Sequence, residues 1–260
     1  LGADDLAREF GLVFSGLHIE KRFNIAPGQV VIVVRPSAAG RGASPAVEGH
    51  ASFRFGLEPD AAAWGLVPSW SKDPRSGPRP INARAETLAE KPMFRGPFRH
   101  GRCIIPASGF YEWKAEGKGK APWYIHPKGA SLFAFAGLSS RWEGPEGELR
   151  TCTIITTEPN ALMRTLHDRM PAILPREHWE EWLDPATRDP GALLVPFAEA
   201  GMEAHPVGAA VGNPRHDGPE LIEPAAGLGE REPRALTWFG AGSYLTADSD
   251  SGGGGMSMRS

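Results

Sequence analysis

The sequence predicts an α+β fold, in which a curled, mainly antiparallel β-sheet is surrounded by a few peripheral helices. Glycine and proline make up 57 of the 260 residues, more than the interior of a helical bundle or a coiled coil tolerates. Short apolar and β-branched runs recur at roughly the 8–12-residue spacing typical of compact β-rich domains. Only a few segments carry apolar residues at helical spacing.

The strands are predicted from short apolar runs, which are separated from one another by turn residues. Residues 30–34 form a continuous β-branched run, typical of a buried strand, and the Ala/Gly/Pro-rich residues 36–51 are expected to form a surface loop. The predicted strands, in chain order, are residues 30–34, 61–70 (interrupted by Pro68), 103–105, 109–113, 123–126, 132–138 and 151–156.

Helices are predicted where apolar residues recur at intervals of three or four. The first, residues 3–14, begins with Asp4 and Asp5, which favour a helix N-terminus. The others are residues 86–94, limited by Pro92, residues 156–170, with Thr157 as N-cap and Pro159 in the first turn, and residues 175–183, with Trp179 and Trp182 on one side.

Composition sets the domain organisation and excludes several classes of protein. Residues 1–224 are expected to form one domain, and residues 225–260 a Gly-rich, disordered tail in which Trp238, Phe239 and Tyr244 form a short docking element. No apolar run reaches the roughly 20 residues that span a membrane, and no signal peptide opens the chain. Two cysteines cannot build a disulfide framework, which indicates a reducing, cytoplasmic compartment.

Charge is distributed unevenly along the chain. The formal net charge is −3, yet residues 71–120 carry 11 Lys and Arg against 5 Asp and Glu. Such a stretch can bind a polyanion locally, although a solvated, loop-rich face has the same pattern.

Three polar residues in unusual positions are the candidates for chemistry. No phosphate-binding glycine loop, dinucleotide fingerprint or zinc motif is present, so neither a cofactor nor a metal is predicted. Asn82 precedes a predicted helix, Glu112 lies between aromatic residues in a predicted strand, and His167 ends a predicted helix. Each has a structural alternative: a turn former, a solvent-facing strand residue and a helix-end cation, respectively. If Glu112 and His167 converge, they suit general acid–base catalysis, with desolvation raising the pKa of the carboxyl.

Seven ordered blocks give this chain a family resemblance. They are RFNIAPGQ (22–29), WGLVPSW (64–70), INARAET (81–87), RCIIPASGFYEWK (102–114), FAGL (135–138), TTEPN (156–160) and LHDRMPAIL (166–174). In this order they resemble the SRAP family of SOS response-associated peptidases, or abasic site processing proteins. Residues 205–224 are similar to the end of that domain, so the resemblance covers residues 1–224 and implies a barrel-like fold.

The resemblance implies a specific chemistry. Family members bind single-stranded DNA at abasic sites and crosslink to the ring-opened sugar through a Cys that follows the initiator Met, its amine and thiol closing a thiazolidine ring. By motif, Asn82 matches the residue that orients the N-terminal Cys, and Glu112 the residue that manages proton transfer at its amine. His167 matches the residue near the sugar hydroxyl that acts in ring opening and in crosslink reversal.

The resemblance also implies how DNA is held. Arg84 and Arg169 are expected on phosphates, and the other matched contacts are Asn24, Pro27, Trp70, Trp113 and Thr156. Aromatic and proline wedges suit a kinked single strand. The implied protein is a cytoplasmic monomer, nucleoid-associated when DNA-bound, whose partner is abasic single-stranded DNA and not a membrane.

The chain departs from the family pattern at its first residue. Family members begin with Met-Cys-Gly-Arg, whereas this sequence begins at Leu1, so it is expected either to be a fragment or to lack the nucleophile. Cys103 and Cys152, in apolar strands, are expected to be buried and inert. The chain as given is therefore expected to bind single-stranded DNA weakly without crosslinking. The alternatives are a non-catalytic module that binds abasic DNA and a peptidase that acts on its own N-terminus.

Overall fold

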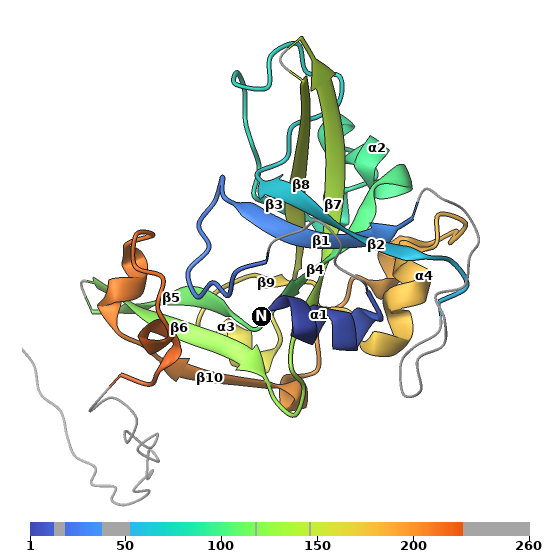
Figure 1. The fold of residues 1–260 in the computed structure, drawn as a ribbon. Helices are drawn as coiled ribbons and strands as arrows, with labels where there is room; N and C mark the ends of the chain where they lie inside the picture. Colours follow the sequence, from blue (N-terminus) through green and yellow to red (C-terminus); the bar gives the residue numbers. More distant parts are fainter. Residues whose placement is uncertain (13–18, 38–52, 118, 146, 226–260) are drawn as a thin grey trace, which may run out of the picture. The chain divides into compact units, whose positions relative to one another are not determined.

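The computed structural model describes residues 1–12, 19–37, 53–117, 119–145 and 147–225, within which there are ten β-strands and four α-helices (Figure 1). Leu1–Gly229 form one compact unit. The predicted tail, with Trp238, Phe239 and Tyr244, lies outside the described residues apart from Ala225, as does most of the predicted loop 36–51. The first predicted helix, residues 3–14, ends already at Phe10, because Gly11 adopts a φ of 65° and caps it. No helix of the described part is long and apolar enough to span a membrane.

Five strands close into a barrel. They hydrogen-bond in the order β2–β1–β4–β7–β8, and β2 returns to pair with β8 in parallel, with Ala63 opposite Thr151 and Trp64 opposite Cys152. The other four pairings around the barrel are antiparallel. The barrel strands are β1 (Val30–Pro36), β2 (Leu57–Trp64), β4 (Arg102–Ala107), β7 (Phe133–Gly144) and β8 (Gly147–Thr157).

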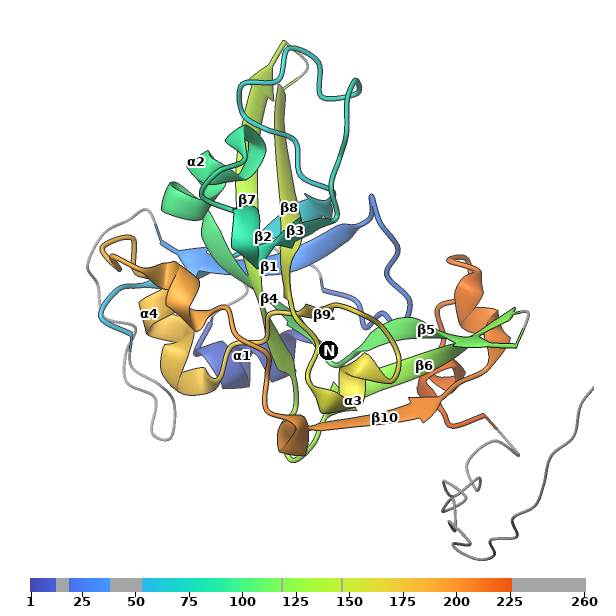
Figure 2. The same ribbon diagram turned by 180° about the vertical axis from the view of Figure 1, so that it is seen from behind.

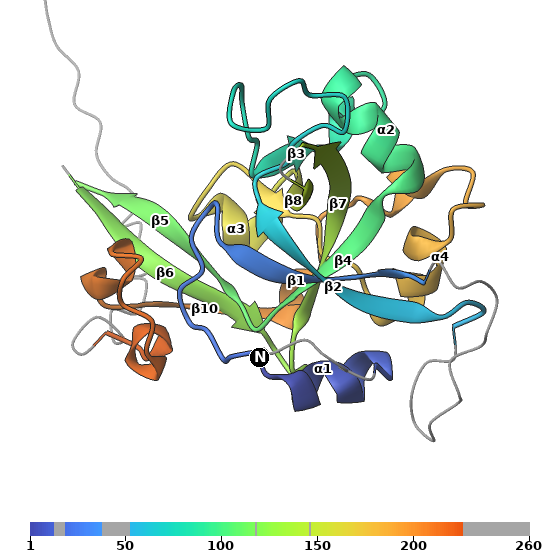
Figure 3. The same ribbon diagram turned by 45° about the horizontal axis from the view of Figure 1, so that its top comes forward.

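A second, three-stranded antiparallel sheet lies beside the barrel (Figure 3). Its order is β10–β6–β5, with β5 spanning Phe110–Glu116, β6 Gly119–Pro127 and β10 Met202–Pro206. Two short strands extend the barrel: β3 (Asn82–Arg84) pairs with β8 in parallel, and β9 (Met170–Pro171) pairs with β8 in antiparallel. The fold class and the mainly antiparallel, barrel-like sheet are confirmed.

Short helices pack around the sheets (Figure 2). Helix α1 (Ala3–Phe10) buries Leu6 and Phe10, and the Phe10 ring stacks on Trp179 at the start of α4 (Trp179–Leu183), with centroids 4.5 Å apart. Trp182 of α4 donates its indole N–H to the carbonyl of Cys103 in the barrel, at 2.9 Å. The predicted helix over residues 175–183 is confirmed as a 3₁₀ turn, Arg176–His178, followed by α4.

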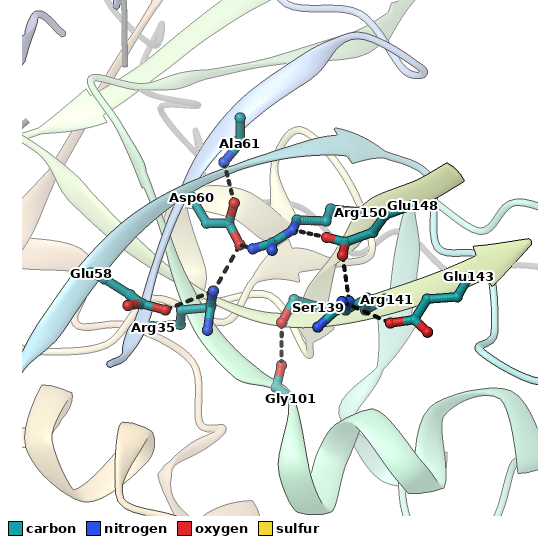
Figure 4. Close-up of polar contacts among 10 residues, drawn as sticks. All are labelled: Arg35, Glu58, Asp60, Ala61, Gly101, Ser139, Arg141, Glu143, Glu148 and Arg150. Carbon is teal, nitrogen blue, oxygen red and sulfur yellow. Dashed lines mark hydrogen bonds and ion pairs between the residues drawn. The ribbon is translucent and has the colours of Figure 1, made fainter. Parts of the chain in front are cut away.

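A network of ion pairs lies at the parallel β2–β8 closure, on the strand faces that also carry Cys103 and Cys152 (Figure 4). The Asp60 carboxylate of β2 accepts hydrogen bonds from Arg35 of β1 at 2.9 Å and from Arg150 of β8. Arg150 also pairs with Glu148, and Glu148 pairs with Arg141 of β7 at 2.6 Å. The network therefore links four barrel strands at the point where the chain makes its parallel closure.

The predicted helix over residues 156–170 is wrong for most of its length. Thr156 and Thr157 continue β8, because their backbones pair with Pro171 and Met170 of β9. Helix α3 covers only Ala161–Arg164, and its N-cap is Asn160, whose side chain accepts the N–H of Met163 at 2.9 Å. His167 therefore lies in the loop between α3 and β9.

Two further boundaries differ from the sequence prediction. In place of a helix over residues 86–94, the chain makes a 3₁₀ turn, Ala85–Thr87, and then helix α2 (Pro92–His100), since proline suits the first helical turn and not an interior. The strand predicted at residues 61–70 is β2, which ends at Trp64 because Gly65 adopts a φ of 141°. The remaining predicted strands are confirmed, most of them extended by a few residues.

Candidate functional site

A cleft of about 840 Å³ lies between the barrel and the second sheet. Strands β1, β4 and β5 supply much of its lining, and the loop of residues 22–27 supplies another wall. Asn82, Glu112 and Trp113, three of the residues singled out from the sequence, line it, and so does Leu1. The cleft therefore joins segments that lie more than a hundred residues apart in sequence.

Glu112 occupies the middle of β5 with its carboxyl half-buried. Alternation along the strand places it on the face of Phe110, whose ring contacts those of Phe133 and Phe135 with centroids 6.2 and 5.8 Å away. Burial raises the pKa of the Glu112 carboxyl, and the nearby charge of His167 opposes part of that rise. Glu112 is therefore not the solvent-facing strand carboxylate of the structural alternative. The expected rise in the pKa of its carboxyl is confirmed.

His167 reaches the same region from the loop after α3. Its imidazole Nδ1 accepts the backbone N–H of Arg169 at 3.1 Å and lies 3.1 Å from an Asp168 carboxylate oxygen. The same Nδ1 also lies 3.3 Å from the carbonyl oxygen of Arg169. The side chain is 45% exposed, so Nε2 is accessible to a ligand. The structure thus brings Glu112 and His167 together, close enough for their charges to interact.

Asn82 and Arg84 are presented by β3 as its two exposed residues. This three-residue strand is held by parallel pairing with β8 and by the carbonyl of Ile81, which accepts the indole N–H of Trp64 at 2.8 Å. Asn82 lines the cleft, and no ion pair of Arg84 is found within the described residues.

Arg169 is engaged within the protein. Its guanidinium binds both carboxylate oxygens of Glu86, at 2.6 and 2.9 Å, and the carbonyl of Thr156 at 2.7 Å. The hydrogen bonds from Arg169 lower the pKa of Glu86. The side chain of Thr156 is buried. The hydrogen bond between the two residues therefore holds the end of the His167 loop against β8, and neither residue presents a free group to a ligand.

The remaining expected DNA contacts divide into exposed and buried residues. Trp113 and Trp70 are 39% and 66% exposed, and Pro27 is also exposed. Pro27 and Trp113 line the cleft, whereas Trp70 is not among its lining residues. Asn24 is only 7% exposed, and its amide donates to the carbonyls of Val211, Asn213 and His216. Its side chain is thus committed to the fold.

Comparison with known proteins identifies the family. A family model described as SOS response associated peptidase (SRAP) matches residues 1–214. The chain belongs to the SRAP family.

Relatives and solved structures agree with this assignment. Abasic site processing protein YoqW of Bacillus subtilis is 46% identical over 206 residues, which cover 77% of this chain and 85% of the relative. Abasic site processing protein HMCES of Gallus gallus is 38% identical over 189 residues, covering 62% of this chain and 56% of that protein. A crystal structure from Bacteroides thetaiotaomicron superposes with a TM-score of 0.59 at 37% identity, covering 65% of this chain and 77% of the other.

The two cysteines of this SRAP chain lie away from the cleft. Both are buried, Cys103 in β4 and Cys152 in β8. Burial raises the pKa of the Cys103 thiol well above its ordinary value and that of Cys152 to about 12, so neither thiolate forms at neutral pH. The expectation of buried cysteines is confirmed.

Several residues that shape the cleft were missed by the sequence reasoning. Tyr111, Gln29, Arg22 and Asp217 fix the loop of residues 22–29, and Asp217 is nearly 200 residues away from that loop in sequence. No local spacing pattern reveals such a contact. For Asp217, the only signal in the sequence was the block resemblance of residues 205–224, which marked the segment without assigning it a role.

Proposed function

We propose that this chain binds single-stranded DNA at abasic sites in the cleft and shields the lesion. The observation that carries the proposal is the pairing of two groups in a SRAP-family protein: a half-buried Glu112, which lines the cleft and whose pKa is raised, and a nearby, partly exposed His167. The names of its relatives, abasic site processing proteins, support the same substrate.

The rim of the cleft suits a single strand that lacks one base. Exposed Trp113 offers a stacking surface for a base next to the gap, and exposed Pro27 offers an apolar wedge. Arg84, two residues beyond Asn82, supplies a cation for the flanking phosphate. We propose that the protein binds this DNA as a monomer in the cytoplasm.

We further propose that the covalent step needs the family's Met-Cys-Gly-Arg segment ahead of Leu1. Because Leu1 lines the cleft, a Cys joined a few residues before it starts close to Glu112. Hydrolysis of the Met–Cys peptide bond first removes the initiator Met and frees the Cys α-amine. This amine adds to the sugar aldehyde, and loss of water leaves an imine. The thiol then adds across the C=N bond, its proton passing to nitrogen, which closes a thiazolidine with the release of one water from the condensation.

The residues of this chain divide the proton transfers of that step. Glu112, whose pKa is raised by burial, accepts a proton from the amine and returns it to the departing hydroxyl. His167 serves the sugar oxygen when the ring opens, through its accessible Nε2. Asn82 orients the N-terminal residue from β3.

A denaturing gel with abasic single-stranded DNA tests the covalent proposal. The chain as given should leave no stable covalent band, and the chain extended by Met-Cys-Gly-Arg should form one. Glu112→Gln in the extended form should slow band formation by about 100-fold, within the range of general acid–base catalysis. A stable band from the unextended chain, or none from the extended chain, would contradict it.

A non-catalytic binding module is the second candidate, and one observation favours it. Among the described residues no cysteine lines the cleft, so the chain as given offers no thiol there.

Self-cleavage at the N-terminus is the third candidate function, and mass spectrometry of the extended form distinguishes it from the other two. A Met that stays in place until a separate aminopeptidase is added would exclude the peptidase reading.

A further inference from the structure

The loop of residues 22–29 forms one wall of the cleft without belonging to any strand. It exposes Ile25 and Pro27, and both line the cleft. Its conformation must therefore be set by contacts from elsewhere. Those contacts come largely from the C-terminal segment of residues 209–217, part of which also lines the cleft.

Asp217 binds three consecutive residues at the start of this loop. One carboxylate oxygen accepts the backbone N–H groups of Phe23 at 2.5 Å and Asn24 at 2.9 Å, and the other accepts the Nε–H of Arg22 at 2.9 Å. Partial burial raises the pKa of this carboxyl, but these hydrogen bonds outweigh it, so the pKa lies below its ordinary value. Asp217 is accordingly ionised at neutral pH.

The loop grips the same segment in return through Asn24. Its side-chain amide donates to the carbonyls of Val211 at 3.0 Å, Asn213 at 3.2 Å and His216 at 3.1 Å. The contacts thus run both ways, from a C-terminal carboxylate to loop amides and from a loop amide to C-terminal carbonyls. Such reciprocal bonding between partly buried groups is costly to break on either side.

Further hydrogen bonds add to this support, among them one from the Arg22 guanidinium to the Gln29 side-chain oxygen at 2.8 Å. The Tyr111 hydroxyl, on β5 beside Glu112, donates to the carbonyl of Phe23 at 2.7 Å. The Gln29 side-chain oxygen accepts the N–H of Ala26 at 2.9 Å, which closes the tip of the loop just before Pro27. The loop is therefore held at its base by Asp217 and Tyr111, and at its tip by Gln29.

We infer that Asp217 is a positioning residue for DNA binding, which fixes residues 22–24 so that Ile25 and Pro27 face the strand in the cleft. The C-terminal segment is then part of the DNA site. This inference rests on the proposed function, because it assumes that the cleft holds DNA. Asp217 touches neither the reacting centre nor a phosphate, and acts only through the loop.

The test compares Asp217→Ala with Glu220→Ala in the full chain. Glu220 is an exposed carboxylate of the same C-terminal segment. Anisotropy with single-stranded DNA carrying a stable abasic analogue should show binding weakened by about tenfold in Asp217→Ala and unchanged in Glu220→Ala. Hydrogen exchange at the Phe23 and Asn24 amides should accelerate in Asp217→Ala alone. The salt dependence of binding should stay as in the wild type, since no phosphate contact is lost.

The outcomes separate this inference from the proposed function. If the wild type does not bind the abasic strand, both fall. If it binds and Asp217→Ala binds equally well despite faster exchange at the two amides, only the positioning role falls. If Asp217→Ala does not fold, Asp217→Asn decides, because it keeps an acceptor for the two amides and loses the charge that pairs with Arg22. A loss of affinity in Asp217→Asn together with faster exchange at the Phe23 and Asn24 amides supports the inference, and unchanged affinity despite that faster exchange overturns it.

Discussion

At the scale of single residues, Glu112 shows how the setting of a strand changes a carboxyl group. It shares a face of β5 with Phe110, and burial there raises its pKa. A raised folded-state pKa means that its contribution to stability is fully present below the unfolded-state value and is lost as the pH rises through the folded-state value. The charged form of this half-buried carboxyl therefore lowers the stability of the folded protein. The proposed chemistry uses the same group.

This cost predicts a stabilising substitution. Glu112→Gln should raise the unfolding midpoint at pH 7 by about 2 °C, because glutamine is never charged. The difference from wild type should shrink as the pH falls through the raised folded-state pKa, and it should be lost below about 4.5, the ordinary value of the carboxyl. Thermal unfolding across this pH range measures it, with Glu116→Gln on the exposed end of the same strand as control. A variant less stable than wild type at pH 7 would contradict the assignment.

Arg84 carries a second prediction at the residue scale. It is exposed on β3 beside the cleft, so removing it should remove a phosphate contact and leave the fold intact. Arg84→Ala should weaken binding to single-stranded DNA and lower the slope of log K against log salt by about 0.7. Anisotropy titrations at several salt concentrations measure it, with the exposed Arg188→Ala as control. An unchanged slope would remove Arg84 from the DNA site.

At the scale of elements, the parallel β2–β8 closure has few backbone pairs, so its stability depends strongly on charged side chains. Only two residue pairs join these strands directly, and the Asp60 carboxylate bridges β1 and β8 across them. Its side chain is 18% exposed, which protects the pairs from screening by salt. The network therefore supports the barrel at its parallel seam.

Breaking this network should destabilise the barrel. Asp60→Asn should lower the free energy of unfolding by about 1–3 kcal/mol, because two arginines lose a charged acceptor. Glu143→Gln, at the exposed end of the same network with a side chain 67% exposed, should change it by less than about 0.5 kcal/mol. Urea unfolding compares the two, and equal effects would show that the seam does not depend on Asp60.

The elements also show where sequence reasoning succeeds. The apolar strand β4 was predictable because its first four side chains are buried, whereas in the β-branched run of β1 only Val33 and Val34 are buried and Val30 is exposed. The helix predicted over residues 156–170 failed because strand pairing with β9, at a distance in sequence, overrides local helical spacing. Thr157 was a plausible N-cap by residue type, but its hydroxyl bonds the carbonyl of Leu194 instead.

At the scale of the whole molecule, the cleft is an assembly of distant segments. Glu112 and His167 were recognisable as candidates, and the raised pKa of Glu112 followed from its aromatic neighbours. Their convergence, the internal engagement of Arg169 and the burial of Asn24 depend on tertiary contacts that no spacing reveals. The resemblance to the SRAP family implied that Glu112 and His167 converge. The contact of Asp217 with the loop of residues 22–29 was visible only in the structure.

The most direct measurement of the central claim is the affinity of the chain for matched DNA ligands. An oligonucleotide with a stable abasic analogue should bind at least about tenfold more tightly as a single strand than as an intact duplex of the same sequence. Trp113→Ala should weaken single-strand binding by about tenfold or more through lost stacking, whereas the exposed Val195→Ala should not. Equal affinity for both ligands, or an unchanged affinity in Trp113→Ala, would contradict the assignment of the cleft to abasic single-stranded DNA.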